Sequence, residues 1–173
     1  TGRGAVFCAG VDLDFMKAYM AGEDTGTGPT LGEEHLVNGW ALDVVAYPKP
    51  VIAALNGTAY GVGVTMTLGC DVRYAASSAT LGLNFTTLGV LPGLGSTHHL
   101  PQLVGIGKAL ELILSGAKVS AEDACAMGLV QRVCAPGEVY FDARNLALAM
   151  AKVKPAVLAA ARKALRQGAT STL

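Results

Sequence analysis

The sequence predicts an α/β fold whose strands are mostly parallel and covered by helices. Short apolar runs alternate along the chain with segments of helical spacing, and this order is typical of parallel sheets in layered folds. The run at 51–55 contains no polar residue, so it indicates a strand buried on both faces. Glycine-rich turns follow predicted strands at Gly10 and Gly61, where the missing side chain lets the backbone approach a neighbouring group closely.

The first part of the chain is expected to form one strand, two helical segments and a mobile loop: strand 5–9, helix 14–20, loop 21–32 and helix 33–47. The loop is predicted by its content of Gly, Thr and Pro. The second helix is predicted because Leu36, Trp40 and Val44 recur every four residues, and Pro48 and Pro50 end it.

The rest of the chain continues the alternation. We expect further strands at 71–75, 80–83 and 129–134, and helices at 61–69, 95–104, 108–115, 120–127, 138–153 and 156–166. The helix at 120–127 opens with a capping-box pattern at Ser120 and ends at Gly128, a residue type that commonly follows helices. No internal repeat or linker interrupts this order, so we expect one domain over residues 1–173.

The composition argues against some classes of partner. The chain has 173 residues, 51% of them hydrophobic, and 13 basic side chains balance 13 acidic ones. A formal charge of zero argues against nucleic acid or an anionic membrane as the main partner, because both attract basic proteins. No apolar run reaches the roughly 18 residues of a membrane span. The high apolar fraction suggests that another subunit covers part of the surface.

The cysteines indicate a reducing compartment. Cys8, Cys70, Cys125 and Cys134 are far apart and have neither metal-binding spacing nor the density of a disulfide-rich secreted domain. We therefore expect free thiols and a cytoplasmic location. Cys8 has two interpretations, a nucleophile or a small apolar residue of a strand, and the second is the commoner role.

The sequence gives little support for a phosphate-binding loop, a metal site or a serine nucleophile. The turn Gly61-Val62-Gly63 is followed by Met66 where a dinucleotide fingerprint needs glycine. The histidines His35, His98 and His99 lack a partner at ligand spacing, so we expect no metal. No serine stands in a nucleophile elbow. Stabilisation of an oxyanion is the chemistry that remains.

An oxyanion hole is predicted from the two glycine turns. If the strands before these turns are neighbours, the N–H groups of Ala9 and Val62 converge on one carbonyl oxygen. Such a pair stabilises an enolate or a tetrahedral oxyanion by about 3 kcal/mol per donor. The alternative is that both are only tight turns with close packing.

Six segments resemble motifs of the crotonase superfamily, also called the enoyl-CoA hydratase/isomerase family. They are FCAGVDL (7–13), KPVIAALNG (49–57), CDVR (70–73), LPGLGST (91–97), LPQLVG (100–105) and ACAMGLV (124–130). In order and spacing they cover nearly the whole chain. By this resemblance the family's first strands and last helices are absent, so we expect a domain that is incomplete at both ends.

The resemblance implies a fold, a ligand and an assembly. The family fold is a spiral of ββα turns with C-terminal helices used in trimerisation, so a homotrimer or a dimer of trimers is expected. Its members bind acyl-CoA thioesters and need no cofactor beyond the coenzyme A of the substrate. By motif the oxyanion donors fall on Ala9 and Val62, and the CoA-binding turn on Ala9, Gly10, Val11 and Asp12.

The departures from the family pattern concern the catalytic acids. The two positions of a hydratase's glutamates fall on Thr65 and Phe85, and some relatives have an aspartate at the position of Gly93. Thr65 either orients water or bonds back to a helix carbonyl. Phe85 is expected to shape an acyl pocket, and Asn84 is either its polar neighbour or a turn residue. We take Gly61, Asn84 and Gly93 as candidate pocket residues.

Other charged residues are weaker candidates. Glu33 and Glu34 begin a predicted helix, and in the family that helix borders the pocket. A basic stretch near the C-terminus is expected to be a solvated helix face or a contact for CoA phosphates: Lys152, Lys154, Arg162, Lys163 and Arg166.

The expected function is that of an acyl-CoA enzyme which stabilises a thioester enolate. Hydration without a positioned acid–base pair would lose about 10²- to 10⁴-fold in rate per group. Isomerisation or decarboxylation, in fatty acid metabolism, is therefore expected in place of two-glutamate hydration. The alternative is a non-catalytic subunit that binds acyl-CoA or an acyl carrier.

Overall fold

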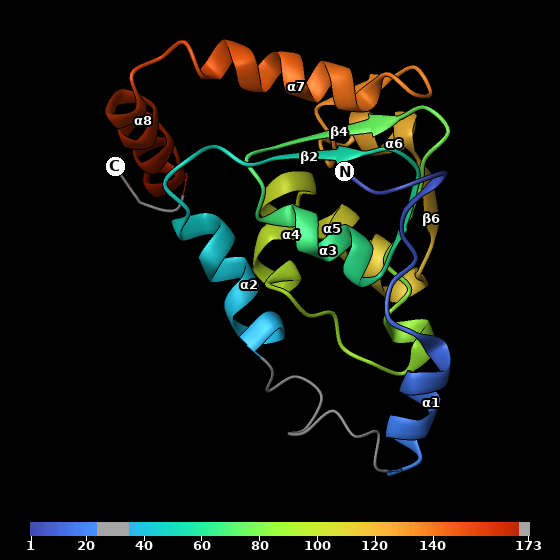
Figure 1. Cartoon of the computed structure of the whole chain (residues 1–173). Helices are drawn as coiled ribbons and strands as arrows, with labels where there is room; N and C mark the ends of the chain where they lie inside the picture. Colours follow the sequence, from blue (N-terminus) through green and yellow to red (C-terminus); the bar gives the residue numbers. More distant parts are fainter. Residues whose placement is uncertain (24–34, 170–173) are drawn as a thin grey trace.

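The computed structural model describes residues 1–23 and 35–169 and shows two small sheets with helices around them (Figure 1). The strands are β1 (Val6–Cys8), β2 (Ile52–Leu55), β3 (Thr58–Tyr60), β4 (Val72–Ala76), β5 (Thr80–Gly82), β6 (Lys118–Ser120) and β7 (Arg132–Cys134). The helices are α1 (Leu13–Met20), α2 (His35–Ala46), α3 (Val62–Leu68), α4 (Ser96–Val104), α5 (Ile106–Ser115), α6 (Ala121–Ala126), α7 (Val139–Met150) and α8 (Pro155–Gly168), with a 3-10 turn η1 (Thr86–Leu88).

The strands are mostly parallel, as the sequence predicts. One sheet has the order β1-β3-β5-β6 and the other β2-β4-β7, and within the described residues only the β5–β6 pair is antiparallel. The predicted helices are present with shifts of a few residues at their ends. Residues 24–32 of the loop predicted at 21–32 lie outside the described residues, together with Glu33 and Glu34.

Two strands were not predicted, and one of them, β3, is the strand that leads into the glycine turn of the candidate site. We expected the strand at 51–55 to lead directly into the glycine turn at Gly61, but β3 lies between them and pairs with β1. The strand at 51–55 belongs instead to the other sheet. Both unpredicted strands, β3 and β6, have only three residues, which is too few for a clear alternation of apolar and polar residues.

Strand β2 is buried on both faces, as predicted for residues 51–55. Ala53 and Leu55 of β2 face the main core, while Ala54 between them faces a second cluster with Tyr74. Helix α7 packs on the second side, and β2 and β4 separate it from α3 and α4 in Figure 1. Alternate side chains of β2 therefore pack into two different hydrophobic cores.

Local signals account for further details. Ser120 caps α6, because its Oγ accepts a hydrogen bond from the N–H of Asp123 at 3.0 Å. All four cysteines are in the described part of the chain, and none of them forms a disulfide, which confirms the expected free thiols. Among the described helices, none combines the length and apolar character needed to cross a membrane.

Helix α8 is held by arginines, which corrects one prediction. We expected Arg162 and Arg166 on a solvated face, but both bind Asp71, with Nε of Arg162 and Nη2 of Arg166 each 2.8 Å from Oδ1. Arg162 also donates to backbone carbonyls at the end of α2, among them that of Val45, and Arg166 donates to that of Gly69 after α3. A cationic side chain at a helix C-terminus is favoured because the last carbonyls have no partner within the helix.

Candidate functional site

Two turns lie side by side because the strands before them are neighbours. Strands β1 and β3 run parallel, with Val6 opposite Thr58 and Cys8 opposite Ala59. Their carboxyl ends therefore meet at one edge of the sheet. The chain leaves β1 through Ala9 towards α1, and it leaves β3 directly into α3.

Glycine is required where the two segments touch. Gly10 has a φ of +99°, and a Cβ there would lie 3.1 Å from the carbonyl oxygen of Tyr60. A Cβ on Gly63 would meet the backbone and side chain of Cys8. A side chain at either position would push β1 away from the start of α3, so these glycines hold the two turns together.

A small cavity of about 70 Å³ opens between the turns. It brings together seven of the predicted site residues: Ala9, Gly10, Val11, Gly61, Val62, Asn84 and Phe85. The other lining residues are apolar side chains that sequence reasoning missed: Leu13, Met16, Leu88 and Val90. Leu13 and Met16 directly follow the first turn with helical spacing, so that signal was available. Leu88 and Val90 are far from this turn in the sequence, and only the tertiary structure brings them to the cavity.

No titratable side chain from the described part of the chain lines this cavity, and Asn84 is its one polar side chain there. Its polarity otherwise comes from the backbone. Val62 is the first residue of α3, and the N–H groups of Val64 and Thr65 both donate to the carbonyl of Gly61. The N–H of Val62 has no partner within the helix, as is general for the first turn. The cavity therefore combines apolar walls with backbone donors.

Phe85 forms one wall of the site beside the oxyanion turn. It is 8% exposed, and a Cβ added at Gly61 would lie 3.8 Å from the tip of its ring and 3.8 Å from the side-chain oxygen of Asn84. Phe85 thus occupies this place with an aromatic ring that cannot exchange a proton. Asn84 offers an amide oxygen and an amide nitrogen at the same wall.

Thr65 is buried and is not among the residues that line the cavity. Its side chain is 1% exposed, and Oγ1 has no hydrogen-bond partner among the described residues. The alternative in which this hydroxyl bonds back to a helix carbonyl is therefore wrong. That bond is made instead by Thr67, whose Oγ1 donates to the carbonyl of Val64 at 2.8 Å.

Two other candidates do not line the cavity. Oδ1 of Asp12 accepts hydrogen bonds from the N–H groups of Asp14 and Phe15 at 2.9 and 3.0 Å, so its carboxylate caps α1. Gly93 lies in the turn before α4, where its carbonyl accepts a bond from Ser96. Gly93 belongs to the segment that joins η1 to α4 and is not among the residues that line the cavity.

His98, His99 and Cys8 lie outside the cavity lining, and the side chain of His35 lies outside the described structure. His98 shares a hydrogen bond with Gln102 at 3.2 Å and stacks edge-on against His99. Cys8 packs against Gly63. No group of His, Cys, Asp or Glu side chains in the described residues has the arrangement of a metal site.

Comparisons with known proteins agree with this geometry. The family model for enoyl-CoA hydratase/isomerase matches residues 1–173. The chain is 40% identical to YngF of Bacillus subtilis over 174 residues, which covers all of this chain and 65% of YngF. It is 37% identical to human enoyl-CoA hydratase domain-containing protein 2, covering 97% of this chain and 57% of that protein. The chain thus spans less than two thirds of the length of these relatives.

Solved structures have the same fold. The enoyl-CoA hydratase of Bacillus anthracis matches with a TM-score of 0.82 and 37% identity, over 97% of this chain and 63% of that one. A Thermobifida fusca protein solved in complex with CoA matches with a TM-score of 0.85 and 29% identity, over 99% of this chain and 67% of that one. The predicted α/β crotonase-like fold is thereby confirmed, and the chain belongs to the enoyl-CoA hydratase/isomerase family.

Proposed function

We propose that this protein acts on acyl-CoA thioesters and stabilises a thioester enolate with the N–H groups of Ala9 and Val62. The turns that carry these groups follow neighbouring parallel strands and line one cavity. Relatives of the same fold support the ligand, because Thermobifida fusca proteins were solved with CoA and with acetoacetyl-CoA. Coenzyme A is then part of the substrate, and Ala9, Gly10, Val11 and Asp12 form the turn beside it.

Decarboxylation is the reaction that this cavity supports best. The observation that carries it is the absence of any acid or base among the described residues that line the cavity. Hydration and isomerisation both depend on proton transfer to or from a positioned acid or base. In a 2-carboxyacyl (malonyl-type) thioester the bond between Cα and the carboxyl carbon breaks instead. Its electron pair forms the enolate, carbon dioxide leaves, and Cα then takes a proton from water.

In this reaction the backbone donors stabilise the developing negative charge, and the apolar walls surround the acyl group. The two N–H groups hold the thioester oxygen as negative charge develops on it, and fixed donors of this kind are most effective where water is excluded. Phe85, Leu88 and Val90 lie against the acyl group and limit the access of bulk water, while a single water molecule can still reach Cα to protonate it. Asn84 is placed to orient the leaving carboxylate by its amide N–H.

A substitution at one backbone position tests the oxyanion model. Proline is tolerated at the first residue of a helix, so Val62→Pro removes the N–H and leaves α3 able to form. We expect its kcat/KM on malonyl-type thioesters to fall by about 10²- to 10³-fold. The matched variant Val62→Ala retains the N–H and should stay within a few-fold of wild type. Equal activity of the two variants on every accepted thioester would show the model to be wrong.

A non-catalytic acyl-CoA binding subunit is the second candidate. It is favoured by the identities of Thr65 and Phe85 at the positions of the family's glutamates. A panel of malonyl-, 2-enoyl- and 3-enoyl-type thioesters should be assayed with wild type and with Thr65→Glu/Phe85→Glu. Turnover by wild type identifies an enzyme, and its preferred thioester identifies the reaction. Turnover only by the double variant identifies a binder.

We also propose assembly as a homotrimer or a dimer of trimers. Large apolar side chains are exposed at regular spacing along α5, at Ile106, Leu110 and Leu114. Faces of this kind usually contact another subunit. Sedimentation velocity should give three or six copies, and a stable monomer would exclude the proposed assembly.

A further inference from the structure

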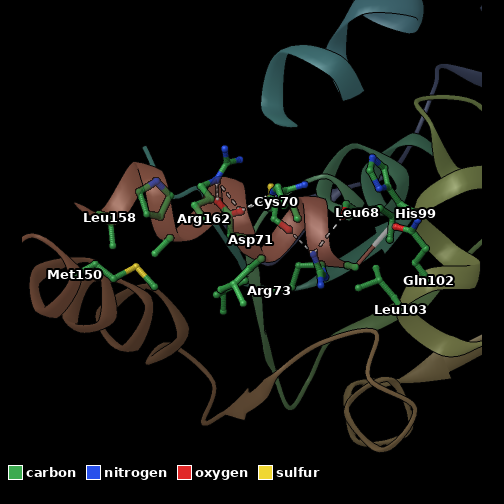
Figure 2. Close-up of a pocket in the computed structure, with 16 residues that line it drawn as sticks. Leu68, Cys70, Asp71, Arg73, His99, Gln102, Leu103, Met150, Leu158 and Arg162 are labelled. Carbon is green, nitrogen blue, oxygen red and sulfur yellow. Dashed lines mark hydrogen bonds and ion pairs between the residues drawn. The ribbon is translucent and has the colours of Figure 1, made fainter. Parts of the chain in front are cut away.

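A second and larger cavity, of about 450 Å³, lies between α8 and the body of the molecule. Its volume is within the ~300–1,000 Å³ typical of small-molecule sites. Its lining is contributed by α3, β4, α4, α7 and α8, and it shares no residue with the cavity beside Val62. In Figure 2, Met150 and Leu158 lie at one end of it, His99 and Gln102 lie at the other, and Asp71 and Arg73 lie between.

Arg73 places a buried positive charge against this cavity. The residue is 2% exposed, and the five hydrogen bonds of its guanidinium group all end on neutral oxygens, of Leu129, Thr67, Leu68, Cys70 and Gln131. No carboxylate in the described part of the chain forms an ion pair with it. A buried charge of this kind is usually paired with a counter-charge.

The neighbouring ion pairs leave the cavity positive. Asp71 is the one acidic residue of its described lining, and it already binds both Arg162 and Arg166. Arg73 adds a positive charge for which the described lining holds no further carboxylate. The pKa of His99 is lowered by burial, then by His98, and further by Arg166 and Arg73, which agrees with a cationic environment at that end.

The rest of the wall is apolar. Leu68, Val72, Leu103, Met150, Leu158 and Leu165 line it. Leu165 remains 76% exposed although it lies on the side of α8 that faces the cavity. A ligand with a hydrocarbon tail would cover this surface, and each buried methylene group would contribute about 0.8 kcal/mol.

We propose that this cavity binds the anion of a medium-chain fatty acid, with its carboxylate towards Arg73 and its tail towards Met150 and Leu158. Guanidinium groups match the geometry of carboxylates, and Nη2 of Arg73 makes only one of its five hydrogen bonds, to Gln131 at 3.3 Å. The ligand would attach α8 to the body through its tail, next to the arginines that already hold this helix. The site is independent of the proposed reaction at Val62.

Calorimetric titration with decanoate, below its micelle concentration, tests the proposal. We expect one site per chain, and binding at least about tenfold weaker for decanol and for decyltrimethylammonium, which carry the same tail without the negative charge. Binding should persist when acetoacetyl-CoA is saturating. Absence of saturable binding, equal binding of the three ligands, or displacement by acetoacetyl-CoA would each overturn the proposal.

Three variants locate the site. Ala161→Trp places a large side chain in the cavity from α8 and should abolish decanoate binding. Ala160→Trp, at the preceding residue of the same helix and outside the lining, should bind like wild type. Gln102→Glu adds a negative charge at the polar end and should weaken decanoate about tenfold, with decanol unchanged. If decanoate fails to bind and Ala161→Trp reduces the oligomeric state, a second copy of the chain covers this face and the proposal is wrong.

Discussion

The two cavities differ in the chemical groups that make their walls polar. The small cavity beside Val62 is formed by backbone turns, glycines and apolar side chains, and its described lining has no charge. The large cavity under α8 also has mostly apolar walls, but four charged side chains line it: Arg73, Asp71, Arg162 and Arg166. Polarity at the first therefore depends on where the backbone runs, whereas polarity at the second depends on which side chains are present. Substitutions that move or block the backbone should damage the first cavity, and substitutions that remove a charge should damage the second.

The largest effect on stability is expected from Gly63→Ala. Alanine normally stabilises a helix relative to glycine, but here its methyl group would clash with the backbone of Cys8. Overpacking of this kind costs about 3 kcal/mol, and denaturant unfolding measures it. Gly107→Ala in α5 is the control, because its methyl group meets open space and should stabilise by about 0.5–1 kcal/mol. Equal effects at the two glycines would mean that β1 and α3 are not in close contact.

The next largest effect is expected from Asp71→Ala. This change removes the acceptor for Arg162 and Arg166 and leaves both guanidinium groups partly buried. Because the site is part-buried, we expect a loss of roughly 2–3 kcal/mol, between the values for exposed and fully buried pairs. Asp14→Ala breaks an exposed pair with Lys17 and should have little effect. A similarly small effect at Asp71 would show that its ion pairs do not hold α8.

The same carboxylate predicts a dependence on pH. Burial raises the pKa of Asp71, but hydrogen bonds from Arg162, from the N–H of Val51 and from Arg166 outweigh it, so the pKa lies below its usual value. A group with a lowered pKa stabilises the fold fully above its unfolded pKa of about 4 and loses this contribution as the pH falls through the folded value. We expect unfolding free energy to decrease over this acid range. The decrease should be smaller in Asp71→Asn, and identical slopes in the two proteins would contradict the assignment.

The smallest effect is expected from Thr65→Val. This isosteric change removes a buried hydroxyl that has no partner in the described structure, so stability should be unchanged or higher by about 1 kcal/mol. Thr67→Val, two residues further along α3, removes a hydroxyl that is bonded to Val64 and should lose about 1 kcal/mol. Weaker binding of acyl-CoA by Thr65→Val, without loss of stability, would show that this hydroxyl contributes to the site. Destabilisation equal to that of Thr67→Val would mean that Thr65 has a structural partner.

Prediction succeeded where the signal was local. The buried strand at 51–55, the cap at Ser120 and the glycine turns at Gly10 and Gly61 are each encoded within a few residues, and the structure contains them. Three-residue strands such as β3 carry too little pattern, so the neighbour of β1 was assigned to the wrong segment. The role of Arg162 was missed because its partner Asp71 is 91 residues away.

The sequence by itself determined the family, the parallel α/β class and the two turns of the candidate site, because these depend on short motifs and on runs of apolar residues. Only the tertiary structure decided that β3 brings the turn of Val62 beside that of Ala9. It also decided that Leu88 and Val90 line the small cavity, and that four charged residues meet under α8. The physical reason is that these contacts join residues far apart in the chain, and the order of strands in the sheets determines which of them meet.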